Sequence, residues 1–466
     1  MNRLVILALL IALSVSPRAL TAADKPVSFY QDMVPVFKRS CNGCHHPGKL
    51  KGQLDLTTYA AFLKGGKHGP GFATNDLKAS LILEEISGAE PSMPKEGDPL
   101  SKAEVALIER WIQQGALDDT PASANSFKLA APPIYLVPPV ISALAYSPDG
   151  KTLAVSGYHE VLLHSADGSN LVARLVGESP RIESLAFSPD GRQLAVAGSA
   201  PARFGEIQIW DFAGIVAGSA SSTGGPSKSF KVTSDSVFGV SWSPDATRVA
   251  VGCADKTVRI LQLSDGKELI KFENHSDWVF GTTWTTNGAR LLSGGRDKAV
   301  KLIDAANGQF IDDINKLLEG VLCLARHPKE DLVAYGGENG ATRIYKMAEN
   351  QGRTAANNDV NLVKECERLP GPVYSIAYSA DGNLIAVGGV NGEMRLFNSK
   401  DGKRLATPKG HEGAIFAVAF NPTMTNQVAS AGFDGKVRLH ETAKGDLLHT
   451  FVPVPIQPAG DQRAAR

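Results

Sequence analysis

Two cysteines and a histidine stand together in Cys41-Asn42-Gly43-Cys44-His45, the attachment pattern of a c-type haem. In that chemistry two thiols form thioether links to the vinyl groups on one edge of a porphyrin, and the adjacent imidazole binds the iron. A chain with five cysteines and ten histidines among 466 residues contains roughly 0.001 such patterns by chance. We therefore predict one covalently attached haem c, held by Cys41 and Cys44, with His45 as the proximal iron ligand.

A disulfide and half of a zinc site are the other interpretations of this cysteine pair. A zinc site needs a second pair of Cys or His ligands at suitable spacing. The nearby candidates are His46 and His68 alone, so the sequence favours haem.

The predicted sixth iron ligand is Met93, in the irregular segment Pro91-Ser92-Met93-Pro94. A thioether there could meet the iron from the face opposite His45, and His/Met ligation raises the reduction potential. Met33 falls at an apolar helix position and is predicted to be a core residue. His68, in a glycine-rich loop, and an open or water-bound sixth position remain as alternatives.

Four short helices are expected to position these residues. They are predicted over residues 28–39, 57–64 and 75–86, with Asn75 as an N-cap, and from Ser101 to Gly115. Ser101 and Glu104 have the spacing of a capping box at the start of the last helix. If the first and last helices cross, Phe37 lies near Trp111.

This part of the chain resembles the planctomycete-type cytochrome c domain. The matching residues are Val34-Pro35-Val36-Phe37, Cys41-Asn42-Gly43-Cys44-His45, Leu54-Asp55-Leu56, Lys64-Gly65-Gly66, Gly69-Pro70, Met93-Pro94 and Trp111-Ile112-Gln113-Gln114-Gly115-Ala116. The resemblance implies a covalently bound haem in an extracytoplasmic setting, with Met93 at the family's Met-Pro position.

The N-terminal segment has the features of a secretory signal peptide. Arg3 precedes the apolar run Leu4–Val15, and the small residues Thr21-Ala22-Ala23 follow. The run is too short to span a bilayer comfortably, although an uncleaved anchor is the alternative. We predict a signal peptide over residues 1–23, a periplasmic or secreted protein, and no membrane span in the mature chain.

Charge and composition narrow the choice of partners. The 48 Lys and Arg balance the 48 Asp and Glu, which argues against nucleic acid as a partner. Lys38, Arg39, Lys49 and Lys51 flank the haem motif and could form a basic rim for an acidic redox partner, or simply a solvated surface.

The rest of the chain is periodic. After a Pro/Ala/Ser-rich linker, residues 121–139, a strand-ending turn recurs seven times at intervals of about 41 to 55 residues. The turns are Ser147-Pro148-Asp149-Gly150, Ser188-Pro189-Asp190-Gly191, Ser243-Pro244-Asp245-Ala246, Thr285-Thr286-Asn287-Gly288, His327-Pro328, Ser379-Ala380-Asp381-Gly382 and Asn421-Pro422. We predict a cytochrome domain over 24–120, a seven-bladed β-propeller over 140–453, and a tail over 454–466.

The strand before each turn alternates small and larger residues, which predicts a strand with one crowded face. One small column is Ala143, Ser184, Gly239, Gly281, Cys323, Ser375 and Ala417. Crowding of this kind is expected of the innermost strands of a propeller, where blades converge on an axis. Cys253 and Cys323 are therefore interpreted as small buried residues; Cys366 is predicted to lie on an outer strand, with no assigned role.

These repeats resemble the WD-repeat family. Trp210-Asp211 is a literal Trp-Asp pair, Gly410-His411 is followed by Asp434, and His275 by Asp297. The resemblance implies that His275 and His411 belong to structural hydrogen-bond networks. Either Ile134–Val137 or Leu447–Val452 could supply the closing strand.

A variable column at the start of the inner strands contains several aromatic residues. Its members are Ser142, Glu183, Phe238, Phe280, Leu322, Tyr374 and Phe416, with Trp278 nearby. Packing between blades is the preferred interpretation, and partner binding at the channel mouth is the alternative.

The predicted protein is thus multidomain: a small all-α c-type cytochrome followed by an all-β seven-bladed WD-repeat propeller. The sequence contains no Gly-x-Ser-x-Gly elbow, phosphate-binding loop or evident Cys/His nucleophile, so an enzymatic role stays uncertain. The leading hypothesis is an exported monohaem cytochrome for one-electron transfer, with the propeller docking a redox partner protein. The alternatives are a peroxidase-like or oxidoreductase enzyme, and a scaffold or sensor with a structural haem.

Overall fold

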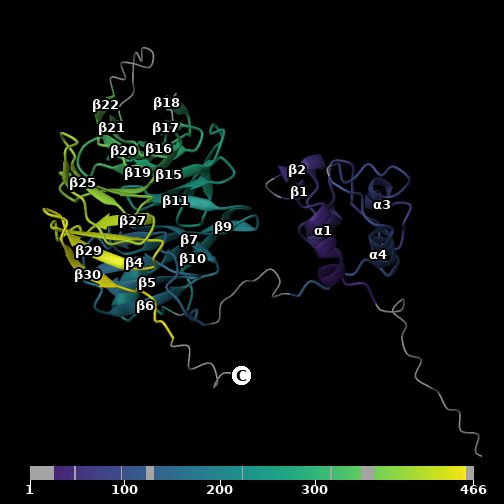
Figure 1. The fold of residues 1–466 in the computed structure, drawn as a ribbon. Coiled ribbons are helices and arrows are strands. Elements are labelled where there is room, and N and C mark those ends of the chain that lie inside the picture. Colours follow the sequence, from purple (N-terminus) through teal and green to yellow (C-terminus); the bar gives the residue numbers. More distant parts are fainter. Residues whose placement is uncertain are drawn as a thin grey trace, which may run out of the picture. The chain divides into compact units, whose positions relative to one another are not determined.

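The computed structural model describes residues 26–46, 49–95, 97–121, 131–222, 224–314, 317, 319–347 and 361–457. The chain folds as two compact units, Met1–Ser126 and Phe127–Arg466 (Figure 1). The predicted signal peptide, residues 122–130 of the linker and residues 458–466 of the tail lie outside the described part. In that part no helix is long and apolar enough to cross a membrane.

The N-terminal unit is built from short helices joined by turns. Its elements are η1 (Phe29–Met33, a π-helical turn), α1 (Val34–Ser40), β1 (His45–His46), β2 (Lys49–Leu50), η2 (Lys51–Gln53, a 3₁₀ turn), α2 (Tyr59–Lys64), α3 (Leu81–Ile86) and α4 (Lys102–Gln113). The predicted capping box of α4 is present, since Ser101 and Glu104 satisfy each other's backbone N–H groups.

The prediction of a helix over residues 75–86 is wrong in its first half. The helix begins at Leu81, and Asn75 adopts a positive φ of 59° in a turn. The Asp76 carboxylate accepts the backbone N–H groups of the residues two and three positions later, both at 3.0 Å. An aspartate side chain that takes these donors competes with the helix, so the chain turns before α3 starts.

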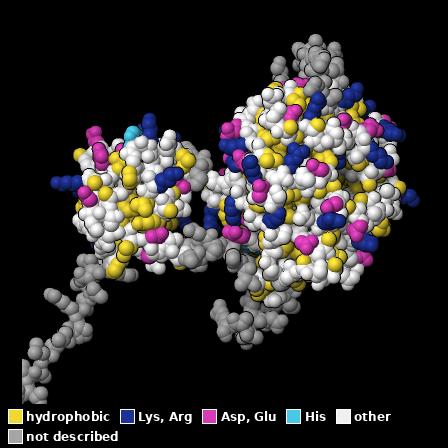
Figure 2. Space-filling model, turned by 180° about the vertical axis from the view of Figure 1, so that it is seen from behind, with side chains coloured by type: hydrophobic (Ala, Val, Ile, Leu, Met, Phe, Trp, Pro, Cys, Tyr) yellow, Lys and Arg dark blue, Asp and Glu magenta, His cyan; other side chains and the backbone are white. Residues whose placement is uncertain are grey.

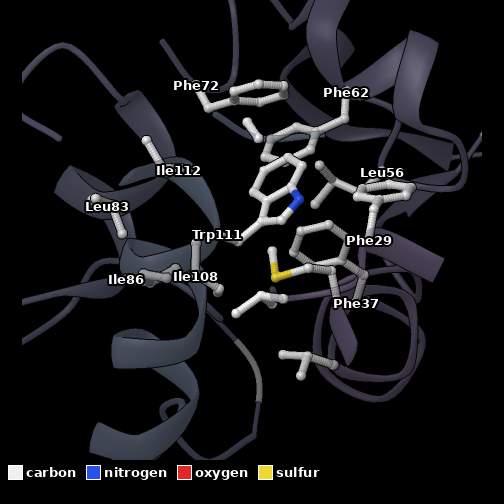
Figure 3. Close-up of a cluster of buried hydrophobic side chains, with 14 of the residues drawn as sticks. Phe29, Phe37, Leu56, Phe62, Phe72, Leu83, Ile86, Ile108, Trp111 and Ile112 are labelled. Atoms are coloured by element: carbon white, nitrogen blue, oxygen red, sulfur yellow. The ribbon is translucent and has the colours of Figure 1, made fainter. Parts of the chain in front are cut away.

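An aromatic cluster forms the core of this unit, with Trp111 of α4 at its centre (Figure 3). Phe37 and Trp111, which the sequence predicts to lie near each other, belong to this one core, and Phe62 is a neighbour of both. Its ring centroid is 5.2 Å from that of Phe37 and 6.2 Å from that of Trp111. Met33 is fully buried in the same core, as predicted.

The C-terminal unit is a seven-bladed β-propeller, as the repeats predict. Each blade is a four-stranded antiparallel sheet of consecutive strands. The innermost strands are β3 (Leu144–Tyr146), β7 (Arg181–Phe187), β11 (Val237–Trp242), β15 (Val279–Trp284), β19 (Val321–Arg326), β23 (Val373–Tyr378) and β27 (Ile415–Phe420). Neighbouring innermost strands contact one another around the whole ring, including β27 with β3.

The remaining strands extend each blade outward. The second strands are β4 (Thr152–Ser156), β8 (Leu194–Ala200), β12 (Arg248–Cys253), β16 (Arg290–Gly295), β20 (Leu332–Gly337), β24 (Leu384–Gly389) and β28 (Gln427–Gly432). The third strands are β5 (Glu160–Ser165), β9 (Phe204–Trp210), β13 (Val258–Gln262), β17 (Ala299–Asp304), β21 (Thr342–Lys346), β25 (Met394–Asn398) and β29 (Val437–Glu441). The outer strands are β6 (Leu171–Val176), β10 (Lys228–Thr233), β14 (Glu268–Phe272), β18 (Phe310–Ile314), β22 (Leu362–Glu365), β26 (Arg404–Ala406) and β30 (Leu447–Phe451). A short helix, α5 (Phe212–Val216), follows β9.

Crowding explains the small residues of the innermost strands. A Cβ atom added to Gly239 of β11 would lie 2.6 Å from the backbone oxygen of Phe280 on β15. Cys323 of β19 occupies an equivalent position, with its Sγ 3.6 Å from the carbonyl oxygen of Val373 on β23. Larger side chains would push neighbouring blades apart, so these columns are a packing requirement.

The tertiary structure decides how the ring closes. Leu447–Phe451 is the outer strand of the last blade, and among the described residues each blade is built from strands that are consecutive along the chain. The segment around Tyr135 instead forms a single parallel bridge to Ile456. The Tyr135 hydroxyl donates to the buried Glu160 carboxylate at 2.8 Å, and this carboxylate also pairs with Arg174. Both ends of the propeller chain are thereby fastened to the first blade.

Two histidine networks tie loops to the second strands, as the WD resemblance implies. The Nδ1 atom of His275 lies 2.9 Å from the Asp297 carboxylate, and its Nε2 atom lies 2.8 Å from the Ser293 hydroxyl. His411 makes the same contacts with Asp434 and Ser430, at 3.1 and 2.9 Å. Both rings therefore have partners at each nitrogen, which indicates a structural role.

Candidate haem site

The motif that carries the predicted haem ligands begins where α1 ends. The Cys41 backbone N–H donates to the Phe37 carbonyl at 2.8 Å, and the N–H groups of Cys44 and His45 both donate to the Cys41 carbonyl at 3.1 Å. On the other side, the Leu56 N–H donates to the His45 carbonyl at 3.0 Å. The helix end and these loop contacts fix the direction in which the two cysteines and the histidine leave the backbone.

A cavity of about 770 Å³ opens beside this motif. Cys41, Cys44, His45 and Met93 all line it, together with His68. Much of the remaining wall is apolar and includes Leu54, Leu56, Phe62, Leu81, Ile82, Ile86 and Leu100. A volume of this size with apolar walls and a few polar groups is typical of a cofactor site.

The side chain of His45 is the strongest sign that this cavity receives a ligand. Its Nδ1 atom is buried and has no hydrogen-bond partner among the described residues, and the same is true of Oδ1 of Asn42. A buried polar atom left unpaired costs about 1–3 kcal/mol. Iron ligation would satisfy one nitrogen of such an imidazole, with an outer hydrogen bond to the other. The residues present therefore fit a haem.

Met93 reaches the cavity because its loop is fastened to α3. Its backbone N–H donates to the Glu85 carbonyl at 2.9 Å, and the Ser92 hydroxyl also bonds the Glu85 side chain. Met93 is half-buried against the aromatic core. Because His68 lines the same cavity, both sixth-ligand candidates are brought to the site.

The five cysteines form no disulfide and differ in their surroundings. Burial raises the pKa of Cys41 to about 11, against the opposing effect of Arg39. Burial likewise raises the pKa of Cys253 and of Cys366 to about 12. Cys41 and Cys44 line the cavity together with His45, while Cys366 follows directly after β22. No group of three or more His, Cys, Asp or Glu in the described residues is placed to hold a metal ion.

Several functional contributors could not be found from local sequence patterns. Of the basic residues predicted beside the haem motif, Arg39 and Lys51 line the cavity, whereas Lys67 and Lys95 line it without having been predicted. Glu85, which anchors the Met93 loop through its carbonyl and side chain, carries no motif. Both contributions depend on loops that meet only after folding.

Aromatic residues of the variable column form contacts between adjacent blades, in agreement with the preferred interpretation that they pack between blades. The ring centroids of Phe238 and Phe280 are 5.0 Å apart, and those of Tyr374 and Phe416 are 5.2 Å apart. Trp278 stays 41 % exposed beside the first pair. The packing interpretation therefore accounts for these pairs, and partner binding there stays a hypothesis.

Protein-family models match both parts of the chain, the N-terminal unit and the propeller. Residues 41–97 match the family model of Planctomycete cytochrome C. Residues 281–458 match the Nucleolar protein 10-like N-terminal domain, residues 203–286 the WD40 domain of anaphase-promoting complex subunit 4, and residues 169–200 the WD domain, G-beta repeat. The resemblance to a planctomycete-type cytochrome c domain joined to WD repeats is confirmed, and the propeller indicates a scaffold for protein–protein interaction.

Curated relatives match parts of the chain only. Periodic tryptophan protein 2 homolog of Dictyostelium discoideum is 34 % identical over 100 residues, which are 20 % of this chain and 11 % of that protein. F-box-like/WD repeat-containing protein TBL1X of Mus musculus is 29 % identical over 148 residues, 30 % of this chain and 27 % of that protein. WD repeat-containing protein 1 of Gallus gallus is 33 % identical over 125 residues, 27 % and 19 % of the two chains. The chain thus spans about a tenth to a quarter of the length of these relatives.

Proposed function

We propose that this protein is an exported monohaem cytochrome c whose propeller docks a partner protein. One observation carries the proposal: a single cavity gathers Cys41, Cys44, His45 and Met93, with a buried His45 nitrogen that lacks a partner. In this assignment Cys41 and Cys44 hold the porphyrin, His45 and Met93 bind its iron, and the N-terminal unit is a c-type cytochrome domain. When bound, the haem supplies one-electron redox chemistry.

The residues around the cavity have separate tasks in this function. The apolar wall excludes water from the porphyrin, which raises the reduction potential further. The bond from Met93 N–H to the Glu85 carbonyl would position Met93, the proposed sixth ligand. Export to the periplasm or beyond is part of the proposal, because haem attachment of this type takes place outside the cytoplasm.

The propeller supports the second half of the proposal. Seven four-stranded blades form a ring, and WD-repeat propellers serve as interaction platforms. Figure 2 shows Lys and Arg interspersed with Asp and Glu over the visible face of the propeller, without one dominant sign. The partner is proposed to be a redox protein.

A spectrum and a mass test the haem assignment. The full chain is exported from a host competent in cytochrome c maturation, and the reduced-minus-oxidised spectrum and intact mass are recorded. We expect the mass of one covalent haem and a low-spin c-type spectrum. The double variant Cys41→Ala/Cys44→Ala should lose both, whereas Cys366→Ala, a matched buried cysteine, should keep both. Colourless protein of unmodified mass refutes the proposal.

The sixth ligand is tested separately. Met93→Ala should open the iron to carbon monoxide in the reduced protein, while Met33→Leu in the core should leave the spectrum unchanged. If Met93→Ala behaves like the parent and His68→Ala opens the site, His68 is the ligand. Rapid carbon monoxide binding by the unmodified protein would favour a reactive, enzyme-like haem instead.

A further inference from the structure

Four cationic residues line the cavity in the N-terminal unit. They are Arg39, Lys51, Lys67 and Lys95, and all four are exposed; we call them the basic rim. Glu85 is the one carboxylate among the described residues that line the cavity. The cavity mouth therefore carries a clear excess of positive charge.

Two of these cations belong to loops that are joined to each other. The backbone N–H of Lys67 donates to the carbonyl of Gly52, the neighbour of Lys51, at 2.7 Å. A Cβ atom added to Gly66 would lie 2.5 Å from the same carbonyl oxygen, so the loops are in close contact. Lys51 and Lys67 therefore lie on two loops that contact each other. Lys95 lies on the separate loop that carries Met93.

The rim is not neutralised by the rest of the unit. Arg39 pairs with Glu104 of α4, but Lys51, Lys67 and Lys95 form no ion pair with any residue in the described ranges. The charges of the unit are also segregated along the chain. Residues 33–70 contain six Lys and Arg and a single carboxylate, Asp55, whose Oδ1 is taken up by Thr57.

We propose that the basic rim docks a small acidic one-electron protein against the mouth of this cavity. The inference rests on the proposed function and names the chemistry of its partner. In the encounter the partner gains or loses one electron as the iron loses or gains one, and no bond or proton moves. Opposite charges at such a contact steer the encounter and act mainly on the association rate, with a strong dependence on salt.

Binding without electron transfer is the primary test. The probe is oxidised plant-type ferredoxin, an acidic one-electron protein, titrated against the ferric holoprotein at ionic strengths of about 10 mM and 150 mM. We expect the Kd to weaken at least about tenfold between the two conditions. Lys51→Glu/Lys67→Glu should weaken the low-salt Kd by at least about tenfold and Lys51→Gln/Lys67→Gln by less. Lys78→Glu, an exposed lysine that does not line the cavity, should change the Kd less than about twofold.

A kinetic measurement separates docking from effects on the haem itself. Reduction by the uncharged lumiflavin semiquinone should proceed at the same rate in all variants, while reduction by reduced ferredoxin should follow the order of the Kd values. An affinity that ignores salt and the rim variants overturns the proposal. So does a shift of the midpoint potential in Lys51→Glu/Lys67→Glu with unchanged Kd, because the rim then serves the acidic side chains of the haem. A protein without haem would instead refute the proposed function, and the two failures are distinguishable by the spectrum.

Discussion

Two histidines, one in each unit, are held in opposite ways. His275 in the propeller has a partner at each ring nitrogen, Asp297 and Ser293, and is almost fully buried. His45 in the N-terminal unit lines a cavity, and its buried Nδ1 has no partner in the described structure. The same side chain is thus complete without a ligand in one unit and incomplete in the other. Because Nδ1 of His164 and of His440 in the propeller are also buried without a partner among the described residues, it is the cavity beside His45, together with its unpaired nitrogen, that marks His45 as a candidate ligand.

Replacing each histidine in turn should give opposite results, and this is the largest expected effect. His45→Ala should abolish the low-spin haem spectrum and leave the unfolding of the propeller unchanged. His275→Ala should keep the spectrum but destabilise the propeller by about 3 kcal/mol, because the buried Asp297 carboxylate and Ser293 hydroxyl both lose their imidazole partner. Spectra and urea unfolding followed by far-UV circular dichroism measure both. The contrast fails if His275→Ala changes the haem spectrum or if His45→Ala destabilises the propeller.

The two units also differ in packing. The innermost strands of the propeller are crowded, whereas the N-terminal unit contains a cavity. Gly239→Ala should destabilise the propeller by about 2 kcal/mol or more, since the new Cβ atom would meet the Phe280 carbonyl. Gly224→Ala, in an exposed loop with ordinary contact distances, should stay within about 0.5 kcal/mol. Thermal unfolding measures the stability of both variants. Equal stabilities would show that the blades can move apart to accept the added Cβ atom.

Acid should loosen the propeller through its buried neutral histidines. Burial, with His411 and Arg438 nearby, lowers the pKa of His440 from 6.5 to about 4. Between pH 6.5 and pH 4, His440 binds a proton in the unfolded chain but stays neutral in the folded chain. The free energy of unfolding therefore falls as the pH drops from 6.5 towards 4. The loss reaches about 2–3 kcal/mol for this residue.

Urea midpoints between pH 7 and pH 4 measure this loss. His440→Gln should flatten the dependence, whereas His449→Gln, an exposed histidine on β30, should preserve it. An unchanged slope in His440→Gln would assign the acid sensitivity to other groups.

The smallest effect concerns the fastening of the propeller ends. Tyr135→Phe removes a hydroxyl that donates to Glu160 and accepts the Tyr158 N–H at 3.0 Å. We expect a loss of about 1–2 kcal/mol in the free energy of unfolding, because Glu160 keeps its bonds to Arg174. Tyr30→Phe, on an exposed tyrosine of the other unit, is the control and should change little. A neutral Tyr135→Phe would mean that the bridge to Ile456 suffices.

Structural features were most predictable from the sequence where they depend on residues close together in the chain. The capping box at Ser101 was found because its two residues are three positions apart, and it holds in the structure. The start of α3 was missed because Asn75 resembles an N-cap, while Asp76 beside it draws the backbone into a turn. Short helices of this kind depend on competition between neighbouring side chains, which a periodic pattern does not reveal.

The sequence alone determined the haem motif, the number of repeats and the crowded columns, because covalent reach and strand alternation act over a few residues. Only the tertiary structure decided that Met93 and His68 share one cavity with His45, and that the ring closes without a shared blade. It also revealed contacts such as that of His164 Nε2 with the Pro453 carbonyl at 2.8 Å, between residues 289 positions apart. Contacts across such separations depend on how whole elements pack, and no local spacing records them.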